Sequence, residues 1–363
     1  MNYCDKICYS VFRSDDPSFE RAVDELMSQL PDDRVILRLV VFGAPENNEQ
    51  YIEQRDILYR QVNCRLAGKL PVVSYVAQPP LEGHLVMELH SYLPDEGDRI
   101  YFRLHGLSPY ILIENACGRF LFAGGFQSDL SSTIYRQSQE VFQSIQDLLK
   151  QEGFPLNTII RQWNYVESIT ACEGNDQHYQ MFNNARSECY ATVNWKNGYP
   201  AATGIGSRCG GVLIDVDAVT FCSDSCFATP IDNKLQVAAH AYSSDVLEEA
   251  GRIKTTPKFE RAKSMTLDGR SLIYISGTAA IRGEESMRDV GVKRQLEITM
   301  ENISQLIGDA GIRLLRVYLK HPEDYPTVKH CLNAYEDSVD ISYLCADVCR
   351  NELLIEVEGI AIE

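Results

Sequence analysis

Two acidic residues near the C-terminus stand in an apolar run that reads LLIEVEG. Alternate side chains of a β-strand point to the same face, so Glu356 and Glu358 should lie together, away from Ile355. Neighbouring carboxyl groups with apolar flanks raise each other's pKa, and a carboxylic acid that stays protonated can deliver a proton to a substrate. The alternative is a solvent-facing pair. The similar segment Leu213–Ala218 (LIDVDA), where we expect no catalysis, keeps that alternative open.

Polar side chains that could hold a carboxylate occur in three further segments. The candidates are Arg161 and Asn164 in RQWNY, Arg186 in NNARSECY, and Arg261 in PKFERA. Arginine suits this task because its guanidinium group is planar, always charged and able to bind a carboxylate through two parallel hydrogen bonds. Any one of these arginines could instead be a solvated surface charge.

An internal repeat indicates which elements would position these residues. Gln137–Leu148 (QSQEVFQSIQDL) resembles Gln295–Leu306 (QLEITMENISQL), and both carry apolar residues at helical spacing. A strand-like run precedes each helix, an extended run follows it, and each copy ends in an acid-bearing strand. These flanking segments are Phe120–Gln127, Ile159–Val166 and Leu213–Ala218 in one copy, and Leu272–Ala279, Leu314–Lys320 and Leu354–Gly359 in the other.

The first hundred residues contain a weaker third copy. It has a strand at Val35–Gly43, a helix at Glu49–Arg65 and an acidic strand at His84–His90. Helices that alternate with strands predict an α+β protein in which mixed sheets carry helices on one face. Chance similarity between ordinary helix–strand units is the alternative explanation.

The composition limits the classes of function. A formal net charge of −17 argues against nucleic-acid binding, which depends on neutralising phosphates, but allows a small anionic substrate held by a few arginines. The opening residues lack the basic and apolar segments of a signal peptide, and no apolar run reaches the roughly 20 residues of a membrane span. We therefore expect a cytoplasmic protein without a membrane partner.

Short motifs for metals and cofactors are missing. The twelve cysteines form no CxxC pair, and without a secretory signal we expect them to be reduced thiols. The chain has no HExxH, no GxxxxGK[ST], no GxGxxG opening a helix and no GxSxG. The sequence thus predicts neither a metal site nor a cofactor.

Four segments of the C-terminal copy are similar to the RidA (YjgF) family. They are ISGTAAI at Ile275–Ile281, the helix at Gln295–Ala310, RVYLKHPED at Arg316–Asp324 and LLIEVEGIAI at Leu353–Ile362. The resemblance implies a trimer-forming fold with ligand clefts between neighbouring subunits. Three such units in one chain would build an internal pseudo-trimer, as a monomer or within a homo-oligomer. The predicted units are a degenerate RidA-like domain at 1–116, a first full unit at 117–230 and a C-terminal unit at 231–363.

A narrower resemblance, to the chorismatase family, covers more of the chain. Its segments are Arg161–Ile169 (RQWNYVESI), Tyr179–Tyr190 (YQMFNNARSECY), Tyr199–Gly206 (YPAATGIG) and Asp347–Gly359 (DVCRNELLIEVEG). The resemblance implies an enzyme that needs no cofactor and cleaves the enolpyruvyl ether of chorismate. The expected products are pyruvate and either 3-hydroxybenzoate or a dihydroxycyclohexadiene carboxylate.

The resemblance also assigns roles to individual residues. Glu356 matches the catalytic glutamate of the family, and Cys349 matches a cysteine of the members that release 3-hydroxybenzoate. Tyr242 and Arg261 match a tyrosine and a carboxylate-binding arginine. Between these two, the stretch at 243–260 is longer, more acidic and more helix-prone than in the family, and it should border the site.

Two other functions remain open. A RidA-like imine or enamine deaminase would need an arginine near the C-terminal strand to grip a substrate carboxylate. Arg350 is available, although the usual Arg-x-Pro setting is missing. A member of the fold that binds small molecules without catalysis is the other alternative, and the altered stretch after Tyr242 favours it.

Overall fold

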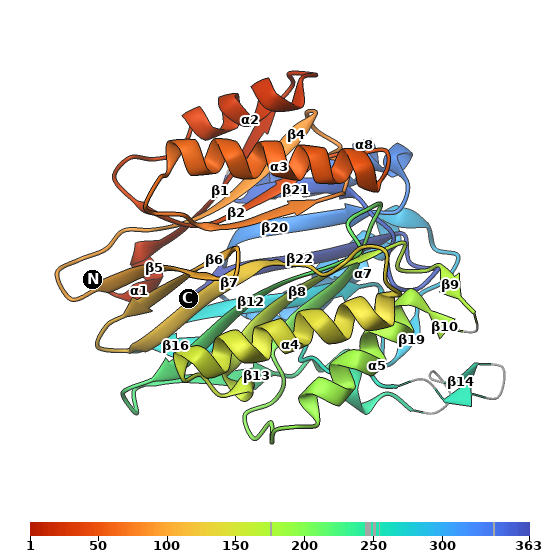
Figure 1. The fold of residues 1–363 in the computed structure, drawn as a ribbon. Helices are drawn as coiled ribbons and strands as arrows, with labels where there is room; N and C mark the ends of the chain where they lie inside the picture. Colours follow the sequence, from red (N-terminus) through yellow and green to blue (C-terminus); the bar gives the residue numbers. More distant parts are fainter. Residues whose placement is uncertain (175, 244–247, 250–251, 254, 337) are drawn as a thin grey trace.

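The chain repeats one order of strands and helices three times (Figure 1). A computed structural model describes residues 1–174, 176–243, 248–249, 252–253, 255–336 and 338–363. Each repeat runs strand, helix, strand, helix, strand, strand, and each builds its own mixed sheet. The repeated units predicted from the sequence are therefore confirmed.

The first unit has a four-stranded sheet in the order β1-β4-β2-β3, in which only β2 and β3 are parallel. The side chain of Asn47 accepts a hydrogen bond from the backbone N–H of Gln50 and so fixes the start of the second long helix. The elements are α1 (Tyr3–Lys6), β1 (Ile7–Ser14), α2 (Phe19–Ser28), β2 (Val35–Phe42), α3 (Asn48–Arg65), β3 (Val72–Val76) and β4 (Leu85–Tyr92).

The second unit has a six-stranded sheet in the order β11-β8-β12-β7-β6-β5. Thr133 caps the start of α4, and Gly153, in the left-handed region at φ 72°, ends it. The elements are β5 (Arg99–His105), β6 (Ser108–Glu114), β7 (Gly118–Phe126), α4 (Ile134–Glu152), η1 (Leu156–Thr158), β8 (Ile159–Glu167), β9 (Cys172–Glu173), β10 (Asp176–Gln177), α5 (His178–Tyr190), β11 (Ala201–Ser207) and β12 (Val212–Phe221).

The third unit repeats this plan in the order β13-β16-β17-β22-β20-β21. Its last strand, β22, lies between β17 and β20 in the middle of the sheet, as β12 lies between β7 and β8. The elements are β13 (Cys226–Ile231), η2 (Ala239–Ala241), β14 (Glu248–Glu249), β15 (Arg252–Ile253), β16 (Ala262–Leu267), β17 (Arg270–Ala279), β18 (Ile281–Arg282), β19 (Glu285–Ser286), α7 (Gly291–Ile307), β20 (Gly311–Leu319), η3 (Pro322–Asp324), α8 (Tyr325–Glu336), β21 (Asp340–Cys345) and β22 (Ile355–Ile362).

The helices lie on the outside and the three sheets face one another (Figure 1). A separate apolar cluster fills the space between each sheet and its own pair of helices. A fourth cluster joins the inner faces of all three sheets and contains buried aromatic residues such as Phe42, Trp163 and Tyr318. Polar side chains on these inner faces are consequently removed from water and need partners from a neighbouring unit.

The sheets run over 7–92, 99–221 and 226–362. β5 and β6 lie before residue 117, yet they extend the second sheet, because β5 pairs with β6 and β6 pairs with β7. β13 begins before residue 231 and pairs with β16 of the third sheet. The domain limits 1–116, 117–230 and 231–363 stay a prediction. The second sheet begins at residue 99 and the third at residue 226, which is 18 and 5 residues before the predicted limits.

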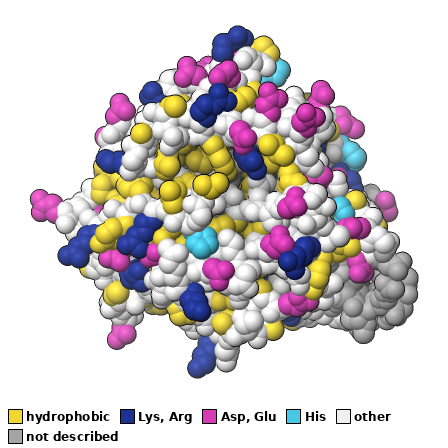
Figure 2. Space-filling model, in the orientation of Figure 1, with side chains coloured by type: hydrophobic (Ala, Val, Ile, Leu, Met, Phe, Trp, Pro, Cys, Tyr) yellow, Lys and Arg dark blue, Asp and Glu magenta, His cyan; other side chains and the backbone are white. Residues whose placement is uncertain are grey.

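The surface shows no continuous basic patch on the face drawn in Figure 2, where lysines and arginines are scattered among acidic side chains. Within the described residues, no helix has both the length and the apolar character required to cross a membrane.

Candidate active site

A cavity of about 1330 Å³ opens between the second and third units. The second unit contributes residues of α5, β11 and the segment before α5, and the third contributes residues of β17, β22 and their loops. Cavities of roughly 300 to 1,000 Å³ already hold drug-sized ligands. The predicted ligand cleft between repeats of one chain is therefore present at this boundary.

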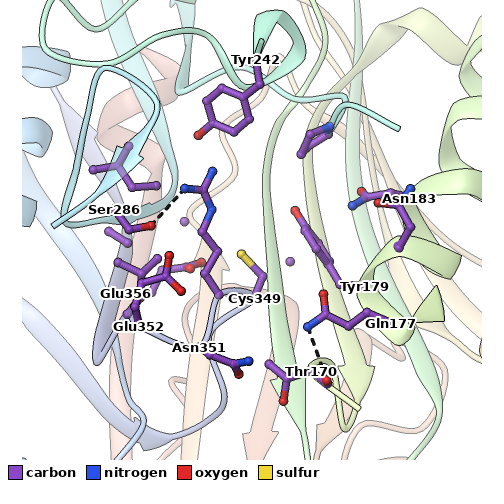
Figure 3. A pocket seen from close by; sticks show the side chains of 18 of the residues that line it. Thr170, Gln177, Tyr179, Asn183, Tyr242, Ser286, Cys349, Asn351, Glu352 and Glu356 are labelled. Carbon is purple, nitrogen blue, oxygen red and sulfur yellow. Dashed lines mark hydrogen bonds between the residues drawn. The ribbon is translucent and has the colours of Figure 1, made fainter. Parts of the chain in front are cut away.

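Glu356 is an acid that reaches this cavity from the middle of the third sheet (Figure 3). It is only 5% exposed, and among the described residues none donates a hydrogen bond to its carboxyl group. Burial, and then the charge of Glu358, raise the pKa of Glu356 to about 8. The carboxyl group is therefore mostly protonated at neutral pH and can act as a proton donor.

Gly277 provides the space for this carboxyl group. The pairing of β17 with β22 shifts register between Ile275 and Thr278, and Gly277 lies at this irregularity. A Cβ atom on Gly277 would lie 2.1 Å from Oε1 of Glu356 and 3.0 Å from Cγ2 of Thr203. Glycine is thus required here by the close approach of an acidic side chain.

Corresponding acids occur at the same position in the other two units. Each unit has an arginine in the strand between its two helices (β2, β8 and β20). This arginine lies opposite a residue of the last strand of the unit (β4, β12 and β22), and an acidic residue precedes that opposed residue by two positions. The opposed pairs are Arg38 with His90, Arg161 with Asp217, and Arg316 with Glu358. The three equivalent acids are consequently Glu88, Asp215 and Glu356.

The carboxylates of the other two acids, Glu88 and Asp215, are occupied by hydrogen bonds to protein groups. Arg316 donates hydrogen bonds of 2.5 and 2.6 Å to Glu88, and His90 contacts the same carboxylate at 2.7 Å. Asp215 accepts hydrogen bonds from the hydroxyl group of Ser74 at 2.6 Å and from the backbone N–H of Gly125 at 2.8 Å. Of these three equivalent acids, Glu356 alone lines the cavity, which explains why one boundary between units is chemically different from the others.

Three buried arginines link the units in a cycle. The guanidinium groups lie 4.6, 4.7 and 5.6 Å from the ring of Trp163 at the centre of the molecule. The contacts between units are Arg38 with Asp217 at 2.8 Å, Arg161 with Glu358, and Arg316 with Glu88. Buried charges of this kind are tolerated only when they are paired, so the cycle holds the three sheets in one relative position.

Cys349 and Tyr179 lie beside Glu356, with Cys349 between the other two in Figure 3. Burial, and then the nearby Glu356, raise the pKa of the Cys349 thiol to about 12. Burial also raises the pKa of the Tyr179 phenol, with Cys349 the next cause. Both groups are protonated and uncharged at neutral pH. They therefore surround Glu356 with weakly polar atoms that favour its protonated form.

Two of the arginines that line the cavity, Arg261 and Arg350, also contact Tyr242. Arg261 donates to the Tyr242 hydroxyl group at 2.5 Å and to the Val237 carbonyl at 2.9 Å. Arg350 lies 5.2 Å from the centre of the Tyr242 ring and donates from Nη1 to the Ser286 hydroxyl group at 3.0 Å. A protonated acid facing two arginines is suited to a small molecule with more than one carboxylate.

Sequence comparisons point to one family. Residues 114–218 match the family described as "Chorismatase FkbO/Hyg5-like, N-terminal". The chain is 31% identical over 233 residues to a 3-hydroxybenzoate synthase of Streptomyces hygroscopicus, covering 58% of this chain and 65% of that protein. It is 30% identical over 247 residues to a chorismatase of Streptomyces rapamycinicus, covering 61% and 68%. The chain belongs to the chorismatase family. The matched stretch spans about two thirds of the length of these relatives.

The chorismatase fold extends over the whole chain. A crystal structure of a chorismatase aligns with 98% of this chain and 98% of its own, with a TM-score of 0.67 and 21% sequence identity. The predicted α+β fold of repeated units is thereby confirmed.

The predicted site residues fall into two groups in this chorismatase-family chain. Glu356, Cys349, Tyr242 and Arg261 all line the cavity. Three further candidates lie outside its lining and contact protein groups. Arg161 binds Glu358 and Thr203, Asn164 donates to the Thr203 carbonyl at 2.8 Å, and Arg186 donates to Asn183 at 2.5 Å. Arg161 and Asn164 belong to β8, and Arg186 belongs to α5.

Several residues that line the cavity are not among the site residues predicted from the sequence. Tyr179 stood in the quoted segment YQMFNNARSECY, but a tyrosine on a helix gives no sign of which face it occupies. Gly277 belongs to the segment ISGTAAI. Its role beside Glu356 depends on the register shift between β17 and β22, which the sequence does not show. The sequence suggests Arg350 only as the carboxylate-binding residue of a deaminase. Its position directly after Cys349 is the signal that places it in the same cavity.

The stretch after Tyr242 borders the cavity, as predicted. Thr255, Pro257 and Phe259 belong to the lining. The expected helical tendency is not met in the part that the structure describes, because Glu248–Glu249 pairs with Arg252–Ile253 as two short antiparallel strands. Positions 244–247, 250–251 and 254, which carry the rest of that prediction, lie outside the described residues.

Proposed function

We propose that this chain binds chorismate in the cavity between its second and third units and cleaves the enolpyruvyl ether, releasing pyruvate. The observation that carries the proposal is the buried carboxyl group of Glu356, which has no hydrogen-bond partner among the described residues and a pKa of about 8. The substrate would come within reach of Arg261 and Arg350 in the same cavity. Two relatives, named 3-hydroxybenzoate synthase and chorismatase, support the same reaction class.

The proposed reaction begins with proton transfer from Glu356 to the vinyl methylene carbon of the enolpyruvyl group. The carbon that carries the ether oxygen then gains oxocarbenium character, and an oxygen nucleophile adds to it. When the nucleophile is water, one of its protons returns to the Glu356 carboxylate. The proton that remains on the new hydroxyl group passes to the ring oxygen as the bond between this oxygen and the carbon breaks, which gives pyruvate. With water as the nucleophile, the ring leaves as a dihydroxycyclohexadiene carboxylate. With a hydroxyl group of the ring itself as the nucleophile, no water is consumed, and the products are pyruvate and 3-hydroxybenzoate, which together contain the same atoms as chorismate.

Cys349 supports 3-hydroxybenzoate as the ring product. Its thiol lies next to the proposed proton donor, is buried, and is uncharged because its pKa is raised to about 12. Such a group can shape the space around the ring and exclude water from the oxocarbenium carbon without competing for the proton. The function is tested by incubating the protein with chorismate, following pyruvate by a coupled lactate dehydrogenase reaction, and identifying the ring product by chromatography. Absence of pyruvate would overturn the proposal and favour the imine deaminase or a non-catalytic binder.

Replacement of Cys349 by alanine is expected to change the ring product more than the rate. Opening space for water beside Glu356 should raise the share of dihydroxycyclohexadiene carboxylate, while pyruvate release changes by less than about tenfold. Chromatography of the ring products measures this ratio directly. An unchanged ratio would show that Cys349 does not determine the product, and Cys345→Ala, which alters a cysteine outside the lining, is the matched control.

Replacement of Arg350 by methionine is expected to raise the KM for chorismate about 10- to 100-fold with little change in kcat. A charged hydrogen bond to a substrate carboxylate contributes about 1.5 to 3 kcal/mol to binding, and methionine keeps most of the packing against Tyr242. The control is Arg288→Met, because Arg288 also lines the cavity but its side chain is 72% exposed. Equal effects of the two substitutions on KM would contradict a specific role for Arg350.

A further inference from the structure

Two thiols and a carboxylate from three distant parts of the sequence meet at the end of the molecule opposite the cavity. Cys117 lies in the turn between β6 and β7, Cys226 is the first residue of β13, and Asp268 lies in the turn between β16 and β17. This is also the end where both chain termini lie (Figure 1). The cluster joins the second unit to the third, which are the two units that form the cavity.

Each thiol of this cluster contacts a different oxygen of the same carboxylate. Sγ of Cys117 lies 3.4 Å from Oδ2 of Asp268, and Sγ of Cys226 lies 3.7 Å from Oδ1. The ligand atoms of the three residues all lie within 4.8 Å of one another. The hydroxyl group of Ser225 donates to Oδ1 of Asp268 at 2.6 Å and holds the carboxylate in place.

These separations match those of a tetrahedral metal site. Zinc–sulfur bonds of about 2.3 Å and zinc–oxygen bonds of about 2.0 Å, at the tetrahedral angle, place sulfur and oxygen about 3.5 Å apart. The two sulfur–oxygen distances, each to a different oxygen of the Asp268 carboxylate, are 3.4 and 3.7 Å and lie close to that value. A cation could therefore enter with small movements of the side chains, and a water molecule would supply the fourth ligand.

We propose that Cys117, Cys226 and Asp268 form a binding site for a soft divalent cation of the zinc class. Two thiolates prefer a soft cation to magnesium or calcium, which take oxygen ligands. Binding replaces the two thiol protons, which are released to the solvent, and the cation with two thiolates and one carboxylate carries a net charge of −1. The bound cation links the second unit to the third at the end remote from the cavity.

This site departs from the sequence-based expectation of no metal. That expectation rested on the absence of closely spaced motifs such as CxxC, whereas the three ligands here come from two sheets and are brought together only by the fold. Affinity for the cation should rise with pH, because the thiols must lose their protons to bind.

Cobalt(II) provides the most direct test, because a thiolate bound to it gives an intense charge-transfer band in the near ultraviolet. The reduced full-length protein should bind about one cobalt ion per chain with this band, and zinc should displace it. Cys117→Ser and Asp268→Asn should weaken or remove the band. Asp268→Asn should leave the fold intact, because asparagine also tolerates the left-handed φ of 49° at this position.

The matched control is Cys222→Ser, since Cys222 is exposed and lies near Cys117 in the sheet without belonging to the cluster. This variant should keep the full band. Three outcomes would overturn the proposal: no charge-transfer band at stoichiometric cobalt, a band unchanged in both cluster variants, or a band lost equally in Cys222→Ser. Chorismate cleavage by Cys117→Ser should stay near the wild-type rate, which separates this test from that of the proposed function.

Discussion

Replacing Glu356 by glutamine is expected to lower kcat for chorismate cleavage by about 10²- to 10⁴-fold, the usual contribution of a positioned proton donor. Glutamine preserves the shape of the side chain and still fits beside Gly277, but it cannot transfer a proton to the methylene carbon. The KM should change by less than about threefold, because the arginines proposed to bind the substrate carboxylates are unchanged in this variant. Steady-state kinetics with the coupled pyruvate assay measure both constants.

The same substitution should stabilise the protein at alkaline pH. The pKa of Glu356 is raised from 4.5 to about 8 in the folded state, so between these values the folded protein holds a proton that the unfolded chain has lost. The free energy of unfolding therefore falls as pH rises through this window, by up to about 1.4 kcal/mol per pH unit. Glutamine does not titrate, so the free energy of unfolding of Glu356→Gln does not fall for this reason. Its Tm should exceed that of the wild type by more at pH 9 than at pH 5, and equal differences would contradict a buried, protonated Glu356.

Replacing Glu358 by glutamine is expected to destabilise the fold by about 3 to 5 kcal/mol. Its carboxylate accepts from Arg316 at 3.0 Å and from Tyr318 at 2.7 Å, and it also pairs with Arg161, which has no other carboxylate partner among the described residues. The substitution thus leaves a buried guanidinium group without a counter-ion. Chemical denaturation of both proteins measures the change in the free energy of unfolding.

A double substitution separates lost pairing from lost packing. Removing the unpaired charge in Arg161→Met/Glu358→Gln should recover a large part of the stability, because a buried pair exchanged for neutral groups costs far less than a broken pair. If the double variant is as unstable as the sum of the two single variants, charge pairing between the second and third units is not what holds them together. Glu358→Gln should also lower the pKa of Glu356, since Glu358 is the second cause of its elevation.

Much of the fold follows from patterns that the sequence displays locally. Helical spacing in Gln137–Leu148 and Gln295–Leu306 predicted α4 and α7, and the acidic strands predicted β12 and β22. The alternation in LLIEVEG placed Glu356 and Glu358 on one face of a strand. The concern that this face might meet solvent is answered by the position of β22 in the middle of the sheet, against a neighbouring unit.

The sequence does not predict which buried charged residues form ion pairs between units and which line the cavity. Arg161 and Arg261 are both arginines in apolar settings, yet one closes a cycle of pairs between units and the other opens onto the cavity. Likewise, Asp215 and Glu356 have the same position in their strands, and only the partners supplied by another unit distinguish them. Long-range contacts decide these roles, and neither residue type nor spacing encodes them.

The pH dependence of kcat/KM for chorismate tests the central claim most directly, because it reports the protonation states of the enzyme before substrate binds. A proton donor with a pKa of about 8 predicts a high plateau below that pH and a tenfold fall for each pH unit above it. Pyruvate release should be followed from about pH 6 to 10 in buffers of constant ionic strength. A rate that instead rises through this range would mean that the reaction needs Glu356 ionised, and would contradict its role as the acid that starts the reaction.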